Sequence, residues 1–190
     1  MDLIPARLIA NSIRGAVEPH VDRVEIAGSI RREKSIVKDV ELVILAPDYE
    51  RLYRVLGDHG RFIKPGVPDI IDWPPKANAK YVRMLLDGDI KLDVFVANEE
   101  NWGSLLCMRT GSGVGPDGNP FTGFSSGILQ RWKKLSGGKM IKGQLVTKDG
   151  VFLPTEEESD LFDLVCLEWI PPPLRMSKSI MKHYEKRTST

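Results

Sequence analysis

Cysteine and histidine are scarce in this sequence of 190 residues, which contains two cysteines and three histidines. Cys107 and Cys166 show no metal-binding spacing, and each lies among apolar residues. We therefore predict two reduced thiols in the core and a reducing compartment. A disulfide framework of the kind that holds small secreted domains together is not expected.

Long hydrophobic runs are also absent. The N-terminal stretch MDLIPARLIANSIRG has no apolar core of signal-peptide length, and no window approaches the length of a membrane span. A cytoplasmic protein is therefore expected, and a virus-encoded protein acting in a host cytoplasm would have the same features. At 42% hydrophobic content, the chain can bury one sizeable core or two small ones.

Acidic residues are missing from one long stretch. The formal net charge of +1 argues against a generally basic nucleic-acid binder, but residues 118–148 contain no Asp or Glu. The positive charges of this stretch are Arg131, Lys133, Lys134, Lys139, Lys142 and Lys148. A second basic segment, 174–187, contains Glu185 as its one acid. Clustered charge of this kind fits a polyanion, with an ordinary solvated face as the alternative.

Hydrophobic periodicity predicts an α+β fold in two parts. In the first part we expect helices at 5–18 and 49–60, strands at 23–29, 39–46, 80–86 and 90–97, and an irregular Pro-rich loop at 64–79. Asp87-Gly88-Asp89 separates the last two strands and predicts a hairpin turn.

The second part is expected to be smaller and mixed. It contains predicted helices at 99–109 and 124–135, a Gly-rich loop at 110–120, and a hairpin at 139–154 that turns at 148–150. Thr155 and Glu158 have the spacing of a capping box before a last helix, which the proline run from Pro171 ends. We place the boundary between the two parts near residue 110.

Three acids stand in or beside apolar strands. Asp39 and Glu41 open one such strand, and their spacing of two residues places both side chains on one face. Asp93 is a lone acid in the strand 90–97. A single strand acid is usually a structural or edge residue. If these two strands pair, however, three carboxylates converge on one patch, where ionised acids are unfavourable unless a cation compensates them.

A pair of divalent cations is the compensation that this donor set favours. Mutual repulsion raises the pKa of clustered carboxylates unless cations lie between them. Oxygen ligands select Mg²⁺ or Mn²⁺ over zinc, and His20, His59 and His183 all lie far from the three acids in sequence.

Gly28-Ser29 supplies a second element of the same site. A glycine at the end of a strand lets the backbone approach a ligand, and the N–H groups and the serine hydroxyl can hold phosphate oxygens. Arg31 and Arg32 follow, and an arginine fork matches a phosphate. Gly-Ser alone is a weak signal, but it is strong when Asp-x-Glu begins ten residues after the serine.

With these residues in place, the sequence resembles the nucleotidyltransferase superfamily and, within it, the family X DNA polymerases, the group of DNA polymerase beta. Six residues fall on the family's Gly-Ser, arginine and carboxylate positions, namely Gly28, Ser29, Arg32, Asp39, Glu41 and Asp93. RTGS at 109–112 matches the family's Thr-Gly-Ser, and PTEEESDLFDLVCLEWIPPPLR resembles its closing segment. The resemblance implies a nucleotidyltransferase palm at 1–110 and a thumb-like subdomain with a basic tail at 111–190.

The resemblance implies a minimal DNA polymerase that adds a deoxynucleotide to a primer 3′-hydroxyl in gap repair or short extension. Its catalytic residues and ligands of a two-metal Mg²⁺ or Mn²⁺ site would be Asp39, Glu41 and Asp93. Its nucleotide-binding residues would be Gly28, Ser29, Arg32, Thr110, Gly111 and Ser112. The primer–template or gapped DNA would lie on Arg131, Lys133, Lys134, Lys139 and Lys142. The other expected partner is a nucleoside triphosphate, with no membrane and a monomeric state.

Three departures from the family pattern accompany this resemblance. Glu41 stands where most polymerases have Asp, and GVGPDGNPFTGF follows Ser112 where the family continues directly into a helix. The sequence begins where the palm begins, so we expect no helical lyase or DNA-clamping domain. Two alternatives stay open at this point: transfer of a nucleotide to RNA, a protein or a small molecule, and a non-catalytic module that binds nucleotide or DNA.

Overall fold

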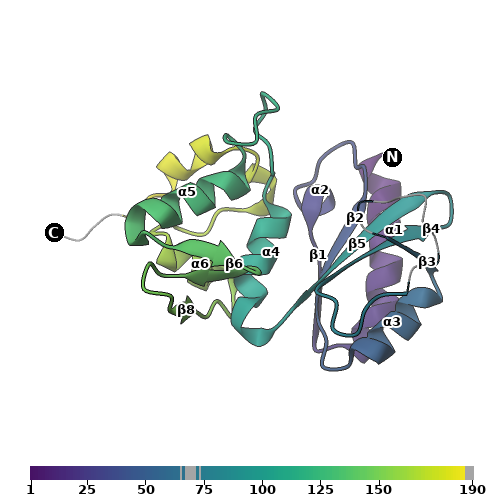
Figure 1. Ribbon diagram of the computed structural model, residues 1–190. Helices are drawn as coiled ribbons and strands as arrows, with labels where there is room; N and C mark the ends of the chain where they lie inside the picture. The colour runs from purple at the N-terminus through teal and green to yellow at the C-terminus, as the bar shows by residue number, and fades with distance from the viewer. Residues whose placement is uncertain (65, 67–71, 73, 187–190) are drawn as a thin grey trace. The chain divides into compact units, whose positions relative to one another are not determined.

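A five-stranded mixed sheet forms the centre of the first 98 residues in the computed structural model, which describes residues 1–64, 66, 72 and 74–186 (Figure 1). Its strands are β1 (Arg23–Ile26), β2 (Val40–Leu45), β3 (Gly60–Ile63), β4 (Tyr81–Leu86) and β5 (Ile90–Ala97). The strand order is β1-β2-β5-β4-β3, and β2 runs parallel to β5 while the other neighbours are antiparallel. The predicted α+β class is confirmed.

The core of this first unit lies on one face of the sheet. Apolar side chains of α1 (Leu3–Val17) and α3 (Tyr49–Gly57) pack there against the even-numbered residues of the central strands, such as Leu42 and Val94. Because strand side chains alternate between faces, Glu41 and Asp93 lie on the opposite face. The helices α2 (Gly28–Arg31) and η1 (Glu18–His20) complete the unit.

The second unit, Glu99–Thr190, has its own core. Its α-helices are α4 (Trp102–Thr110), α5 (Phe124–Ser136) and α6 (Glu158–Leu164). A small antiparallel sheet contains β6 (Lys139–Ile141), β7 (Gln144–Val146) and β8 (Phe152–Leu153). Short 3₁₀ helices are η2 (Glu99–Asn101), η3 (Pro172–Leu174) and η4 (Lys178–His183).

A buried ion pair stabilises this second core. The Arg175 side chain is fully buried, and its Nη1 atom lies 2.5 Å from Oε1 of Glu158. Its Nε donates to the Ile170 carbonyl, and its guanidinium lies beside the rings of Phe124 and Phe162. The pair joins the start of α6 to the segment that follows η3, which keeps the end of the chain against the core.

The two units divide between Asn98 and Glu99 rather than near the predicted residue 110. The reason is the packing of α4, whose Cys107 lies in the second core. Gly103 of α4 lies so close to the backbone of Glu157 and Glu158 that a methyl group there would overlap it. Helix α4 therefore belongs with α6.

In the second unit, the hairpin and the capping box differ from the sequence prediction. The predicted single hairpin at 139–154 is two hairpins, because Lys142 and Gly143 both adopt positive φ and form the first turn, between β6 and β7. The predicted capping box of Thr155 and Glu158 is wrong. Glu157 and Asp160 form it instead, since Thr155 is buried and accepts a hydrogen bond from the Ser104 amide.

The thiol prediction is half correct. Both cysteines are free and Cys107 is buried as predicted, but Cys166 is exposed, because the chain turns there with a φ of 53° at the end of α6. The predicted helix 49–60 ends at Gly57 and leaves room for β3, which the sequence did not signal. The predicted loop at 64–79 lies partly outside the described residues. Within the described ranges, no helix combines the length and the apolar character that crossing a membrane requires.

Candidate active site

The parallel pairing of β2 with β5 brings two of the three acids together. Glu41 and Asp93 are direct partners in the register of these strands. Paired residues on neighbouring strands present their side chains on the same face of a sheet. Asp39 precedes β2 by one residue, and the Asp93 charge acts on its carboxyl group. Glu41 and Asp93 thus lie side by side on one face of the sheet, and Asp39 lies near enough to Asp93 for their charges to interact.

Asp93 already has a cationic partner. Its Oδ1 and Oδ2 atoms accept hydrogen bonds of 2.6 Å from Nε and Nη2 of Arg83, and the Tyr81 hydroxyl donates to Oδ1 at 2.8 Å. Asp93 is 5% exposed, so these bonds form largely out of water. The bonds to Asp93 raise the pKa of Arg83 above its usual value. The buried carboxylate of β5 is therefore compensated by arginine in this structure.

Asp39 lies in a different electrostatic environment from Asp93. Burial raises the pKa of Asp39 above its ordinary value, and repulsion from Asp93 raises it further, while Arg83 and two lysines oppose the shift. Arg32 lies near the same acids: burial lowers its pKa, and the charges of Glu41 and Asp39 act in the opposite direction. The site therefore combines three acids with Arg32 and Arg83, and Lys38 and Lys91 also act on Asp39.

Gly28 permits the close approach of β2 to the Gly-Ser turn. Its φ of 61° is in the left-handed region, and a methyl group on it would overlap the Glu41 carboxylate. The Ala27 amide donates to the Glu41 carbonyl at 2.9 Å, which fixes the turn against β2. Beside them, the Ser29 hydroxyl oxygen is buried and has no hydrogen-bond partner among the described residues. A buried hydroxyl without a partner is unfavourable, and a ligand oxygen would satisfy it.

The donor set fits a hard cation in its chemistry, although its side chains are not arranged around one. Among the residues that the structure describes, no group of three His, Cys, Asp or Glu side chains is positioned to hold a metal ion. Asp39, Glu41 and Asp93 offer oxygen atoms only, as Mg²⁺ and Mn²⁺ prefer. To bind a metal ion, Asp93 would have to leave its ion pair with Arg83.

Thr110, Gly111 and Ser112 lie in the second unit, at the end of α4. The Gly111 amide donates to the Cys107 carbonyl at 2.8 Å, and the Ser112 amide donates to the Arg175 carbonyl at 2.9 Å. Gly111 also packs so tightly on Phe124 and Ser125 that a larger residue would displace them. The turn is thus rigidly held, and its role in a sugar pocket stays a prediction.

The basic residues of the second unit have unequal surroundings. Lys133 and Lys134 are exposed in the last turn of α5, and Lys139 is exposed on β6. Lys142 is exposed in the turn between β6 and β7. Arg131 donates to the Val165 carbonyl and lies 2.6 Å from Oε1 of Glu185, so it holds the C-terminal segment to α5. Contact of all five with DNA stays a prediction.

Tyr81 and Arg83 are the site residues that sequence reasoning missed, although a signal for them exists. The predicted hairpin turn is centred on Gly88, and pairing two strands about that centre places Arg83 opposite Asp93, as the structure does. Opposite charges at directly paired positions are a recognised stabilising pattern. An alternating strand with an arginine facing the lone acid was therefore sufficient to find the partner of Asp93.

Comparison with known proteins identifies no relative, because no protein-family model and no curated protein matches this chain.

Proposed function

We propose that this chain is a metal-dependent nucleotidyltransferase, most specifically a minimal family X-like DNA polymerase with a palm in the first unit and a thumb-like second unit. The observation that supports this most is the register of β2 and β5. It pairs Glu41 with Asp93, and the Asp93 charge acts on Asp39, on the sheet face opposite the helical core. Gly28 lies directly against Glu41.

In this proposal Asp39, Glu41 and Asp93 hold Mg²⁺ or Mn²⁺. When bound, such ions lower the pKa of an attacking hydroxyl and neutralise charge on a leaving pyrophosphate. The protein residues do the positioning. Binding requires that the Asp93 carboxylate leave Arg83, whose side chain is 30% exposed and can turn toward solvent or substrate. Arg83 is therefore a competitor of the metal for Asp93.

The phosphates of a nucleoside triphosphate fit the other half of the site. The Ser29 hydroxyl has an unused bonding capacity at a buried position. Arg32 lies near Glu41 and Asp39, where the approach of a triphosphate would offset the burial that lowers its pKa. The reaction forms a bond from a 3′-hydroxyl oxygen to the α-phosphorus and breaks the bond to pyrophosphate, and the hydroxyl proton leaves to Asp93 or water.

A non-catalytic nucleotide- or DNA-binding module is the second candidate. The two-bond pair between Arg83 and Asp93 favours it, because a partly buried ion pair with this geometry compensates Asp93 without any metal. In that case the acids are a structural ion-pair cluster, and the protein binds nucleotide or DNA without turnover.

Primer extension on a gapped duplex distinguishes these candidates. Each nucleotide is offered singly, in Mg²⁺ and in Mn²⁺, with DNA and RNA primers and with an unpaired 3′ end as comparisons. Incorporation that follows the template base supports the DNA polymerase. Incorporation on RNA alone, or incorporation that ignores the template, supports transfer of another kind. Absence of metal-dependent pyrophosphate release with every acceptor supports the binding module.

A further inference from the structure

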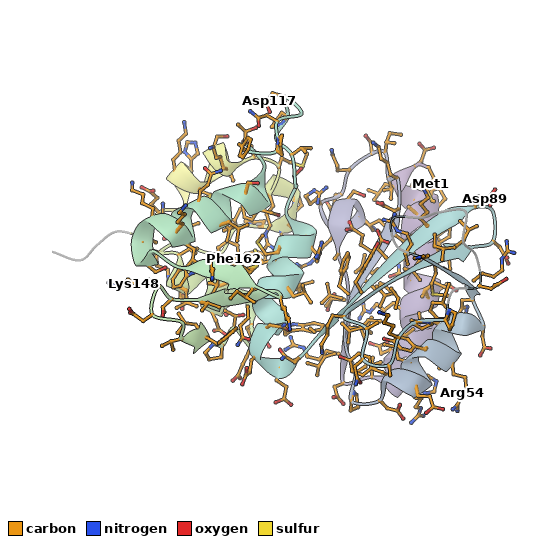
Figure 2. The ribbon with its side chains drawn as sticks, in the orientation of Figure 1. Met1, Arg54, Asp89, Asp117, Lys148 and Phe162 are labelled. Carbon is orange, nitrogen blue, oxygen red and sulfur yellow. The ribbon has the colours of Figure 1, made fainter. Side chains whose placement is uncertain are left out.

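The segment that interrupts the family pattern forms a rigid loop. This loop, residues 113–123 and here named the exposed loop, joins α4 to α5 and projects from the second unit, with Asp117 at its tip (Figure 2). Inside it, the Gly115 amide donates to the Asn119 carbonyl at 2.9 Å. The Asp117 Oδ1 atom accepts from the Thr122 hydroxyl at 2.7 Å and from the Asn119 amide at 3.1 Å. These bonds give the loop one defined conformation.

The exposed loop is also tied to the fold at both ends. The Ser112 hydroxyl donates to the Val114 carbonyl at 2.6 Å, which links the loop to the predicted nucleotide-binding turn. At the other end, the Thr122 carbonyl accepts from the Lys178 amide at 3.0 Å. The side-chain amide of Gln130, on α5, donates to the Phe121 carbonyl at 3.0 Å. The backbone of Phe121 is therefore anchored.

This anchored backbone holds an aromatic ring in solvent. Phe121 is 72% exposed, and its amide is fixed by the side chain of Asn119. A single exposed apolar side chain is ordinary on a mobile loop. A phenyl group on a backbone that is fixed at both its N–H and its C=O is instead partly preorganised, because the backbone loses little conformational entropy when a partner covers the ring.

The chemistry around the ring selects the kind of partner. The exposed loop contains no Lys or Arg and carries the ionised Asp117, whose pKa is lowered by its bonds to Thr122 and Asn119. Phosphate is therefore disfavoured at the tip itself. Cations lie beside it, since the Lys178 ammonium bonds to the neutral side chain of Gln130, and Lys182 is exposed in the same 3₁₀ helix. A flat uncharged surface flanked by phosphates matches this arrangement.

We propose that Phe121 is a stacking platform for an unpaired nucleobase of the nucleic-acid substrate, where a single strand leaves the duplex. The inference rests on the proposed function for its substrate class. Stacking on an aromatic side chain tolerates every base, because each has a π-face, and contributes about 5- to 150-fold in affinity. The flanking lysines contact the backbone without reading sequence.

The test measures binding, without metal or nucleotide, so that it does not depend on catalysis. Duplexes with a single-stranded overhang containing 2-aminopurine are titrated with the full chain, and fluorescence quenching and affinity are recorded. Phe121→Ala is expected to weaken overhang binding at least 5-fold, to remove the quenching and to leave binding of a blunt duplex within 2-fold. Phe121→Trp is expected to keep both signals. Phe152→Ala, at another exposed phenylalanine of this unit, is the matched control.

Substitution of the stacked nucleotide by an abasic site provides the decisive comparison. It is expected to weaken binding of the wild type and to leave Phe121→Ala unchanged. Equal overhang binding by wild type and Phe121→Ala would overturn the inference, as would an equal loss on blunt duplex. If Phe121→Ala changes only the self-association of the protein, the inference is also overturned, and the ring belongs to an interface between protein copies. If the wild type extends primers while Phe121→Ala binds the overhang normally, the stacking inference is wrong and the proposed function stands. If stacking is observed without any nucleotide transfer, the proposed function is wrong and the stacking inference stands.

Discussion

At the residue scale, Asp39 and Asp93 carry the same functional group in opposite circumstances. Asp93 is compensated by two hydrogen bonds from Arg83, whereas burial and repulsion raise the pKa of Asp39. A carboxyl group with a raised pKa binds its proton more tightly in the folded chain than in the unfolded one. Ionised Asp39 therefore lowers stability at neutral pH, and this penalty shrinks as the pH falls through its folded-state pKa and is gone below its unfolded-state pKa.

Asp39→Asn should consequently raise the melting temperature at pH 7 in the presence of a chelator. The gain should shrink as the pH falls through the raised pKa and vanish below the ordinary value of 3.8. Asp93→Asn should lower the melting temperature instead, because it weakens the bonds of Arg83, at a cost of about 1–3 kcal/mol. Thermal unfolding of both variants at pH 7 and pH 4 measures this. A lower melting temperature for Asp39→Asn at pH 7 would contradict the described electrostatics.

Glu41 should set the metal preference. Glutamate is one methylene longer than the aspartate common at this position in the resembled family, so Glu41 would be a less constrained ligand for a divalent ion. Mn²⁺ tolerates an imperfect octahedron better than Mg²⁺ does. The ratio of nucleotide incorporation in Mn²⁺ to that in Mg²⁺ should therefore be larger for the wild type than for Glu41→Asp. Equal ratios would show that the side-chain length at residue 41 does not control the site.

At the element scale, the Gly-Ser turn and β2 form one unit whose geometry depends on Gly28. Gly28→Ala combines strain at a φ of 61° with overlap of the Glu41 carboxylate. Gly150→Ala is the matched control, since Gly150 also has positive φ, 85°, but a methyl group there meets nothing within 4 Å. We expect Gly28→Ala to lower stability by about 1–3 kcal/mol more than the control in chemical denaturation. A difference below 0.5 kcal/mol, roughly the scatter of surface substitutions, would mean that the turn and β2 adjust freely.

Many helices and strands were predictable from the sequence, because their local sequence signals agree with their tertiary packing. The strand 90–97 was predicted with its observed bounds, since its apolar run ends at Asp89 and Asn98, and the 80–86 strand differs by one residue. The carboxylate patch followed from the same alternation. By contrast, β3 has four residues and pairs only with β4, so no periodic signal marks it.

The errors occur where tertiary contacts override local sequence signals. Thr155 has the residue type of a helix cap, but it is buried against Ser104 of α4. Gly103 likewise assigns α4 to the second unit through its contact with Glu157, which lies far away in sequence. The state of Asp93 required the strand register, because Arg83 is ten residues away and only the hairpin brings the two together.

At the scale of the whole molecule, net charge conceals an uneven distribution of cations. If about four residues of the acid-free stretch 118–148 contact phosphates, the logarithm of affinity for duplex DNA should fall with the logarithm of salt at a slope near −3.6. Lys133→Ala/Lys134→Ala should reduce that slope by about two units and weaken binding to all sequences alike. The same double substitution at Lys182 and Lys186 tests the basic tail. An unchanged slope in the first variant would show that α5 faces solvent in the complex.

The central claim concerns the joint action of the three carboxylates, and one rate measures it. Single-turnover incorporation opposite a one-nucleotide gap is compared between wild type, Asp39→Asn and Asp93→Asn, with Asp89→Asn, at an exposed acid of the β4–β5 turn, as the control. Each of the first two variants should lose at least about 10³-fold in rate, because each would remove a proposed metal ligand, and Asp89→Asn should stay within 2-fold. Retention of more than a tenth of the wild-type rate by either Asp39→Asn or Asp93→Asn would contradict the assignment of this site.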